Sequence, residues 1–334
     1  MNSTVPIGVV HYGLGPIGLA VASLVSERPW LRSVGAVDIS PDLGGRRLGE
    51  VTGHEAGGPV IGPRFVRPAE AAAIAVHCTG SSLVQVAPQI LELASAGLNV
   101  ISTTEELAFP WQAHPAAAAE IDAGARGAGV TVLGTGINPG YAMDYLPIAL
   151  SAVAQRVDRV AVHRVQDAAT RRLPLQRKIG AGLSQEAFRA ATASGRLGHV
   201  GLTESAHTLA RAFGWRLTDL QEVIEPIVAD EPTQMAESLI KPGQVLGLHQ
   251  TAEGMVDSRT VISLTLDMAV GAGPSLDRVR LVGVPDLELE VPGGLHGDLA
   301  TAAIAVNAIP RVLAAAPGLV VMADLAPPTP GPPQ

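Results

Sequence analysis

Short apolar runs alternate with stretches of helical spacing through the first part of the chain. The apolar runs that read as strands are residues 7–12, 31–37, 74–80, 99–102 and 130–133. Apolar residues recur at helical spacing in the intervening segments 17–25, 83–96 and 115–125. Because strands that alternate with helices form parallel sheets, we predict a Rossmann-type, doubly wound α/β domain over residues 1–140.

The pattern changes after residue 140. Helix is predicted over residues 141–154 and through most of residues 184–212, and strands over residues 157–165, 256–270 and 279–291. The last two runs follow each other without a crossover helix, which implies antiparallel pairing. We therefore expect a second, α+β domain over residues 141–296, with an open and mainly antiparallel sheet that binds substrate and forms a homodimer.

The C-terminal segment is expected to return to the first domain. One helix, from Asp298 to about Ala315 by spacing, lies within residues 297–326, which complete that domain. The proline-rich tail, residues 327–334, is predicted to be disordered. The apolar window 300–325 is interrupted by polar residues and prolines, so we do not expect it to span a membrane.

Composition limits the classes of partner. The 334 residues are 47% hydrophobic and 16% charged, which describes a globular chain long enough for two domains. The net charge of −8, with no run of Lys or Arg, argues against nucleic acid and anionic membranes as partners. The N-terminus has no secretory signal pattern, so we expect a cytoplasmic protein that acts on a small molecule.

A glycine-rich turn follows the first strand and opens the first helix. In Gly13-Leu-Gly-Pro-Ile-Gly18, Gly13 permits the tight turn, Gly15 lets the backbone approach a pyrophosphate, and Gly18 allows close helix-to-strand packing. Asp38 ends the second strand at the spacing where an acid binds the adenine ribose. Residues 1–140 are therefore a predicted dinucleotide-binding domain. Asp38 would repel a 2′-phosphate and favours NAD, although the loop pair 46–47, both Arg, keeps NADP as an alternative.

Two adjacent carboxylates follow the strand at residues 99–102. Glu105 and Glu106 lie beyond its carboxyl end, which is where ligands bind in doubly wound sheets. This position suggests proton transfer partnered with hydride transfer. The alternative is a solvated pair at the start of a helix, which the helix dipole favours.

Other catalytic chemistries find little support in the sequence. The nine histidines are scattered without an HExxH motif, and the single cysteine, Cys78, excludes a cysteine-rich metal site, so no metal is expected. Cys78 is interpreted as a small buried residue at a strand end, because no local motif would activate its thiol. The sequence also lacks the GxSxG elbow of a serine hydrolase.

Four blocks of sequence, in this order, resemble a known family. They are GLGPIG at 13–18, STTEELAFP at 102–110, GTGINPGYAMD at 134–144, and GLHGDLATAA at 294–303 with VNAIP at 306–310. These blocks look like those of the 2,4-diaminopentanoate dehydrogenases and related native amine dehydrogenases, which are distant relatives of dihydrodipicolinate reductase. The resemblance implies NAD(P)-dependent reductive amination of a ketone or aldehyde with ammonia, and the reverse oxidative deamination.

The resemblance also implies roles for individual residues. Glu105 becomes the general acid/base and Glu106 the fallback, because the matching loop of the reductases lies beside the nicotinamide. His296 is interpreted as a spacer between two glycines. The predicted dinucleotide contacts are Gly13, Gly15, Pro16, Ile17, Gly18, Asp38, Thr79, Gly80, Ser81 and Thr103. The predicted substrate contacts are Asn138, Arg164, Gln166 and His199.

The substrate class and the reaction class keep alternatives. Residues 271–277 lack the histidine expected in the diamino acid enzymes, which predicts a preference for less polar ketones or amines. Dihydrodipicolinate reductase and homoserine dehydrogenase are disfavoured, since the only lysines are Lys178 and Lys241. An oxidoreductase acting on a non-nitrogen alcohol, or a noncatalytic NAD-sensing module, remains an alternative function.

Overall fold

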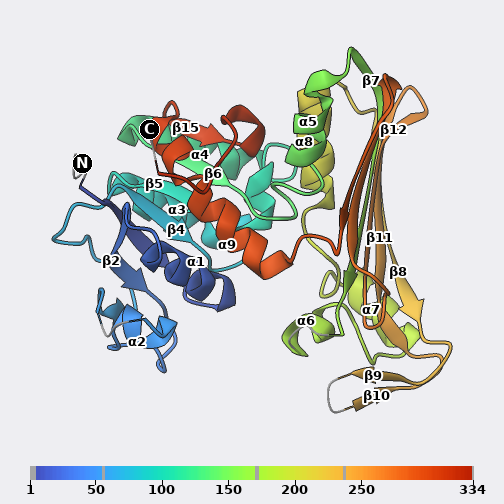
Figure 1. Ribbon diagram of the computed structural model, residues 1–334, viewed down its shortest axis with the longest axis horizontal. Helices are drawn as coiled ribbons and strands as arrows, with labels where there is room; N and C mark the ends of the chain where they lie inside the picture. The colour runs from blue at the N-terminus through green and yellow to red at the C-terminus, as the bar shows by residue number, and fades with distance from the viewer. Residues whose placement is uncertain (1–4, 55–56, 170–172, 236–237, 333–334) are drawn as a thin grey trace. The chain divides into compact units, whose positions relative to one another are not determined.

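The computed structural model describes residues 5–54, 57–169, 173–235 and 238–332 (Figure 1). The chain divides into two compact units. Unit 1 contains Met1–Tyr141 and His296–Gln334, and unit 2 contains Ala142–Leu295.

Unit 1 is built on a seven-stranded parallel sheet with the strand order β15-β6-β5-β4-β1-β2-β3. Its strands are β1 (Ile7–Tyr12), β2 (Leu31–Val37), β3 (Ile61–Gly62), β4 (Ile74–His77), β5 (Asn99–Ser102), β6 (Thr131–Gly134) and β15 (Gly318–Val320). The order runs outward from β1 in both directions, so the topological switch point lies between β1 and β4. This confirms the doubly wound α/β fold.

Helices cover this sheet and bury its apolar side chains. They are α1 (Pro16–Ser26), α2 (Leu48–Thr52), α3 (Leu83–Ser95), α4 (Pro115–Ala128), α9 (Gly297–Asn307) and α10 (Ile309–Ala314), with the short 3₁₀ helices η1 (Glu105–Ala108) and η3 (Met322–Asp324). On α3, Leu83, Val86, Ile90 and Leu93 recur every three or four residues and are buried in one apolar cluster with α4.

The C-terminal segment differs from the single helix predicted for it. Helix α9 ends at Asn307, and α10 begins at Ile309 with Pro310 in its first turn, because proline cannot continue the hydrogen bonding of a helix interior. A strand that the sequence pattern did not predict, β15, then pairs with β6. The stretch Gly297–Ala314 is long and apolar enough to cross a membrane by length and composition alone. In unit 1, however, α9 packs on α1, and α10 packs against β5 and β6.

Unit 2 is built on a six-stranded sheet with the order β14-β13-β7-β12-β11-β8. Its strands are β7 (Arg156–Asp167), β8 (Asp219–Val228), β11 (Val245–Val256), β12 (Arg259–Ala269), β13 (Leu276–Val284) and β14 (Leu287–Pro292), with a separate two-stranded ribbon of β9 (Thr233–Met235) and β10 (Ser238–Ile240). Strands β7 and β12 are parallel, and the other pairs of this sheet are antiparallel. The expected open, mainly antiparallel sheet is therefore confirmed.

The described helices of unit 2 lie on one side of this sheet (Figure 1). They are α5 (Tyr145–Leu150), α6 (Leu173–Lys178), α7 (Gln185–Ala193) and α8 (Leu202–Phe213), with the 3₁₀ helix η2 (Ser151–Val153). Along β11 the burial alternates, since Leu248, Gln250 and Ala252 are buried while His249 and Thr251 are partly exposed. Helix α8 packs on β11 and β12, so the buried residues form the core of the unit.

Several elements of unit 2 depart from the predicted boundaries. The run 279–291 consists of two strands, β13 and β14, and the helix predicted from residue 141 begins at Tyr145. The Asp144 side chain accepts a hydrogen bond from the Tyr145 N–H at 2.6 Å and so caps this helix. The sequence pattern did not predict β8 or most of β11. Strand β8 carries mostly polar and exposed residues, so it shows no clear apolar alternation.

Candidate active site

The glycine-rich turn leaves open space in front of the N-terminus of α1. A methyl group added at Gly15 would meet no described heavy atom within 4 Å. By contrast, a methyl group added at Gly13 would lie 2.6 Å from the carbonyl oxygen of Cys78. A methyl group added at Gly18 would lie 1.9 Å from the carbonyl oxygen of Gly13. Gly15 is the N-cap of α1 without a side-chain hydrogen bond, and Pro16 occupies the first turn. Free helix N–H groups beside open space fit the pyrophosphate of a dinucleotide.

Asp38 joins the end of β2 to this turn. Its Oδ2 accepts from the Leu14 N–H at 2.6 Å, and its Oδ1 accepts from the Ser40 N–H at 2.7 Å. A carboxylate has about four acceptor positions, so two backbone contacts still leave acceptors for ribose hydroxyls. In the neighbouring loop, Arg47 Nη1 donates to the Gly58 carbonyl at 3.0 Å, while Arg46 is exposed.

Two loops at the ends of β4 and β5 are bonded to each other. Thr104 Oγ1 donates to the Gly80 carbonyl at 2.8 Å, and the Glu106 N–H donates to the Ser81 carbonyl at 3.4 Å. The loop carrying Thr79, Gly80 and Ser81 is therefore held beside the loop carrying Thr103.

A network of hydrogen bonds between uncharged side chains supports these two loops. His77 Nδ1 contacts Ser102 Oγ at 2.9 Å, and His77 Nε2 contacts Gln89 Oε1 at 2.8 Å. The Thr79 hydroxyl joins Gln89 at 2.8 Å, and the Ser102 hydroxyl donates to Thr104 at 2.9 Å. Burial lowers the pKa of His77, while its bond to Gln89 acts in the opposite direction. The imidazole is therefore neutral near pH 7.

The two adjacent glutamates have different environments. Glu106 Oε2 accepts from the Leu83 N–H, at the start of α3, at 2.6 Å and lies 2.9 Å from His114 Nε2. Its carboxylate therefore caps a helix from outside that helix. Glu105 is half-buried, and within the described part of the chain its carboxylate has no hydrogen-bond or ion-pair partner. Of the two, Glu105 is the carboxylate left available for a ligand.

The turn after β6 brings further polar atoms to the same edge of the sheet. The Thr135 N–H donates to the Ser102 carbonyl at 2.9 Å, and a methyl group on Gly134 would lie 2.4 Å from the backbone of Leu107 in η1. Asn138 is 8% exposed. Within the described residues, neither its Oδ1 nor Thr135 Oγ1 has a hydrogen-bond partner. A buried acceptor without a donor is costly unless a ligand supplies one.

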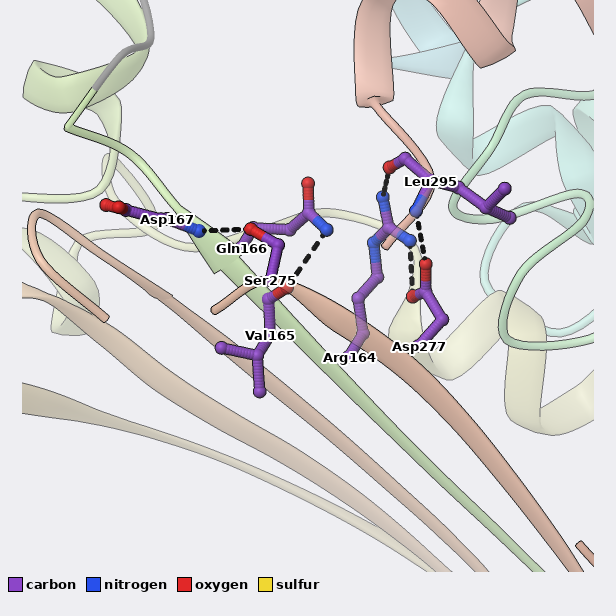
Figure 2. A network of polar contacts seen from close by, with 7 residues as sticks. All are labelled: Arg164, Val165, Gln166, Asp167, Ser275, Asp277 and Leu295. Carbon is purple, nitrogen blue, oxygen red and sulfur yellow. Dashed lines mark hydrogen bonds and ion pairs between the residues drawn. The ribbon is translucent and has the colours of Figure 1, made fainter. Parts of the chain in front are cut away.

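Arg164 is buried and is bonded to other groups of unit 2. It is 2% exposed and forms an ion pair with Asp277, which is 0% exposed. Its Nη2 donates to the Leu295 carbonyl at 2.7 Å, and Asp277 Oδ2 accepts from the Leu295 N–H at 2.7 Å (Figure 2). These bonds engage Nη1 and Nη2 of the guanidinium, and the expected contact between Arg164 and a substrate carboxylate stays a prediction.

The other two predicted substrate residues of unit 2 are half-buried. Gln166 Nε2 donates to the Val165 carbonyl at 3.0 Å, and Figure 2 shows its amide oxygen turned away from that bond. The backbone of His199 is held by Gln250, whose Oε1 accepts from the His199 N–H at 2.8 Å and whose Nε2 donates to its carbonyl at 2.7 Å. Gln250 also donates to Glu222 at 2.8 Å, and burial raises the pKa of Glu222.

Three further features bear on the chemistry. Burial raises the pKa of the Cys78 thiol to about 12, although a hydrogen bond with Thr103 lowers it, so Cys78 is not a thiolate at neutral pH. His296 is the N-cap of α9, where its Nδ1 accepts from the Leu299 N–H at 3.5 Å. Across the ranges that the structure describes, no group of three or more His, Cys, Asp or Glu residues could hold a metal ion.

Sequence reasoning missed several residues that bind or support the predicted site residues of each unit. Asp277 lies in the segment 271–277, which lacks a histidine, and its place opposite Arg164 depends on the register of β7 and β13. Gln250 carries no motif and is recognised only by its two bonds to His199. Thr104 belongs to the block of residues 102–110 that resembles the family, and a hydroxyl next to the strand end is its only signal in the sequence.

The sequence matches a family model and a curated relative. Residues 141–330 match the model of the 2,4-diaminopentanoate dehydrogenase C-terminal domain. The 2,4-diaminopentanoate dehydrogenase of Acetoanaerobium sticklandii is 32% identical over 333 residues, which cover 96% of this chain and 93% of that protein.

Solved structures share the fold. The amine dehydrogenase from Mycobacterium smegmatis has a TM-score of 0.84 and 23% identity, with 98% of both chains covered. The WlbA dehydrogenase from Bordetella pertussis, solved with NADH and UDP-GlcNAcA, has a TM-score of 0.50 and 14% identity over 86% of this chain and 80% of that one. The family model covers more than half of the chain, and the Acetoanaerobium sticklandii relative covers nearly all of it. This chain therefore belongs to the 2,4-diaminopentanoate dehydrogenase family of oxidoreductases.

Proposed function

We propose that this protein is an NAD(P)-dependent amine dehydrogenase that aminates a ketone or aldehyde with ammonia and runs oxidative deamination in reverse. The observation that carries the proposal is the Glu105 carboxylate, which has no partner among the described residues, at the strand-end edge that also holds the dinucleotide turn. The names of the Acetoanaerobium sticklandii and Mycobacterium smegmatis relatives support the same class of reaction.

Glu105 is proposed to move every proton that the reaction requires. Ammonia attacks a carbonyl only in its neutral form, and the carbinolamine that forms must lose water before the carbon can be reduced. One carboxylate within hydrogen-bond reach can accept the proton from nitrogen and return it to the leaving oxygen. When bound, a reduced nicotinamide supplies the hydride.

Asn138 is proposed to bind the nitrogen of the substrate. Its Oδ1 is a buried acceptor that no described residue satisfies. An amine or iminium nitrogen carries N–H donors, so it would complete this hydrogen bond. A carbonyl oxygen would not, because it has no donor. The position therefore favours the aminated form of the substrate over the ketone.

NAD is the proposed cofactor, with NADP as the alternative. The negative charge of Asp38 lies at the end of β2 and is bonded to the glycine-rich turn itself. A 2′-phosphate would be repelled by this carboxylate. We expect a lower KM for NADH than for NADPH, and we expect Asp38→Ser to narrow the difference. If the ratio of the two KM values were unchanged in Asp38→Ser, Asp38 would not be the residue that selects NAD.

The proposed substrates lack a carboxylate. The guanidinium of Arg164 is bound to Asp277 and Leu295, and residues 271–277 offer no histidine in its place. We expect small ketones and simple amines to be better substrates than amino acids. A much higher kcat/KM for 2,4-diaminopentanoate than for cyclohexanone or a small aliphatic amine would contradict this expectation.

The deciding experiment follows NADH oxidation with a panel of ketones, with and without ammonium. We expect turnover that requires ammonium in the wild type and is lost in Glu105→Gln with NADH affinity unchanged. Glu120→Gln is the matched control, since Glu120 is an exposed residue of α4. Turnover independent of ammonium would point to alcohol and ketone chemistry. NADH binding without any turnover would indicate a nucleotide sensor.

We further propose a cytoplasmic homodimer that forms through the sheet of unit 2. The described helices of this unit lie on one side of the sheet (Figure 1), and the half-exposed His163, His249 and Asp267 lie on its strands β7, β11 and β12. An open sheet face favours a covering partner, and a second copy is the simplest closed one. Light scattering that gives the mass of one chain would contradict the dimer.

A further inference from the structure

Arg164 and Asp277 together hold both backbone groups of one residue. They face each other across β7 and β13, and both are almost completely buried. The Leu295 carbonyl accepts from Arg164 at 2.7 Å, and the Leu295 N–H donates to Asp277 at 2.7 Å. With the ion pair itself, these bonds form a closed ring (Figure 2). The ring fixes Leu295, which lies outside the strands, to β7 and β13.

The residue held in this way lies where the chain changes unit. Leu295 is the last residue of unit 2, and His296, the next residue, is the N-cap of α9 in unit 1. On the other side of Leu295, Gly293 and Gly294 have φ of 80° and 63°, which favours glycine. Leu295 is therefore the fixed point between a glycine turn and a helix.

Helix α9 leads from this point to the helix that follows the glycine-rich turn. Within unit 1, α9 packs along α1, and the first turn of α1 carries the glycine-rich motif. The path from the ion pair to the motif therefore runs through Leu295, α9 and α1. A small shift of Leu295 would be passed on to the orientation of α1, and a small misplacement of reacting groups lowers the rate without changing the affinity for the cofactor.

We propose that Arg164 and Asp277 are positioning residues that fix the return of the chain at Leu295 and thereby align the reacting groups. Burying an ion pair is unfavourable unless further hydrogen bonds satisfy it. In this protein those further bonds go to the main chain at the crossing. The kinetic consequence depends on the amine dehydrogenase function proposed above, whereas the structural consequence does not.

Arg164→Lys tests the two interactions of Arg164 separately, because it retains the ion pair with Asp277 and removes the hydrogen bond to the Leu295 carbonyl. A lysine ammonium retains the positive charge beside Asp277, but it lacks the planar fork that reaches a second acceptor. Arg159→Lys is the matched control, because Arg159 lies on the same strand, is exposed, and donates to Ser263. We expect Arg164→Lys to lower kcat about tenfold for all substrates, as small misplacements do. The Kd for NADH should remain unchanged, and Arg159→Lys should have no effect.

Amide hydrogen exchange tests the hold on Leu295 without any substrate. We expect the Leu295 amide to exchange about tenfold faster in Arg164→Lys, since the hydrogen-bonded ring is opened. If that variant does not fold, the double variant Arg164→Met/Asp277→Leu removes both charges, and the same acceleration is expected. Wild-type exchange at Leu295 in the folded variant overturns the proposal, even if the wild type shows no amine turnover.

The kinetics also discriminate against two other roles. A purely structural pair would lower the melting temperature and leave kcat per folded molecule unchanged. A substrate subsite would raise KM only for substrates that carry a carboxylate. Either result, in place of a loss of kcat shared by all substrates, overturns the proposal.

Discussion

Polar side chains differ in hydrogen bonding between the strand ends of unit 1 and the paired strands β7 and β13 of unit 2. In unit 1 the Glu105 carboxylate, Asn138 Oδ1 and Thr135 Oγ1 have no partner among the described residues. In unit 2 Arg164 is bonded to Asp277 and to the main chain of Leu295. Polar groups that the fold leaves unsatisfied are available to a ligand, whereas satisfied ones stabilise the fold. Residue type alone does not separate these two classes.

The largest expected effect is on Glu105. Glu105→Gln removes the proposed proton acceptor and should lower kcat by about 10²–10⁴. Steady-state rates with ammonium and a ketone measure this loss. Its neighbour sharpens the contrast, because Glu106→Ala should retain turnover per folded molecule and destabilise the protein by about 1 kcal/mol through loss of the cap on α3. Equal losses of turnover in both variants would break the distinction.

The next largest effect is expected from Arg164→Ala. It leaves the Asp277 charge buried without its partner and should reduce the free energy of unfolding by about 3–5 kcal/mol. Urea unfolding measures the difference. An apolar pair, Arg164→Met/Asp277→Leu, should be less destabilised than Arg164→Ala because no charge remains buried. A loss below about 1 kcal/mol in Arg164→Ala would mean that water screens the pair, as at a surface.

Acid should weaken unit 1 through its neutral imidazoles. Burial lowers the pKa of His11 from 6.5 to about 4. Between these values the unfolded chain binds a proton that the folded chain does not, so the contribution of His11 is complete above pH 6.5 and is lost as the pH falls toward 4. A tenfold difference in proton affinity between the two states corresponds to about 1.4 kcal/mol, so the folded state should lose about 3 kcal/mol of stability through His11 as the pH falls over this range.

Substitution of His11 tests this pH dependence directly. Urea unfolding between about pH 7.5 and pH 5 should show a smaller loss of stability in His11→Gln than in the wild type, because the substituted side chain binds no proton. His54→Gln is the control, because His54 is exposed. Identical pH dependence in wild type and His11→Gln would show that the imidazole is not responsible.

The sequence predicted unit 1 better than unit 2 for a physical reason. Parallel strands buried on both faces are continuous apolar runs, and glycine or proline marks their ends. Strand β8 is largely polar and exposed, and β15 has only three residues, so neither produces a recognisable run. The break between α9 and α10 was missed because apolar spacing continues through Pro310.

The candidate site was predictable only where it follows from strand order. The carboxyl ends of parallel strands meet at one edge, so strand order alone predicts Glu105 at the edge that holds the glycine-rich turn. Whether Glu106 and Arg164 are available to a ligand depends on partners distant in sequence, Leu83 and Asp277. A single sequence without its strand register does not identify such partners.

The smallest expected effect is that of Gly15→Ala. Comparison with Gly18→Ala distinguishes a glycine that leaves room for a ligand from one that the packing of the fold requires. A methyl group at Gly15 meets no described atom within 4 Å, whereas one at Gly18 would lie 1.9 Å from the Gly13 carbonyl oxygen. Gly15→Ala should therefore retain the wild-type melting temperature and raise the Kd for NADH about tenfold, equivalent to about 1.4 kcal/mol. Gly18→Ala should lower the melting temperature as well. Fluorescence titration with NADH and thermal unfolding measure the two quantities, and an unchanged Kd in Gly15→Ala would mean that the pyrophosphate does not bind at this turn.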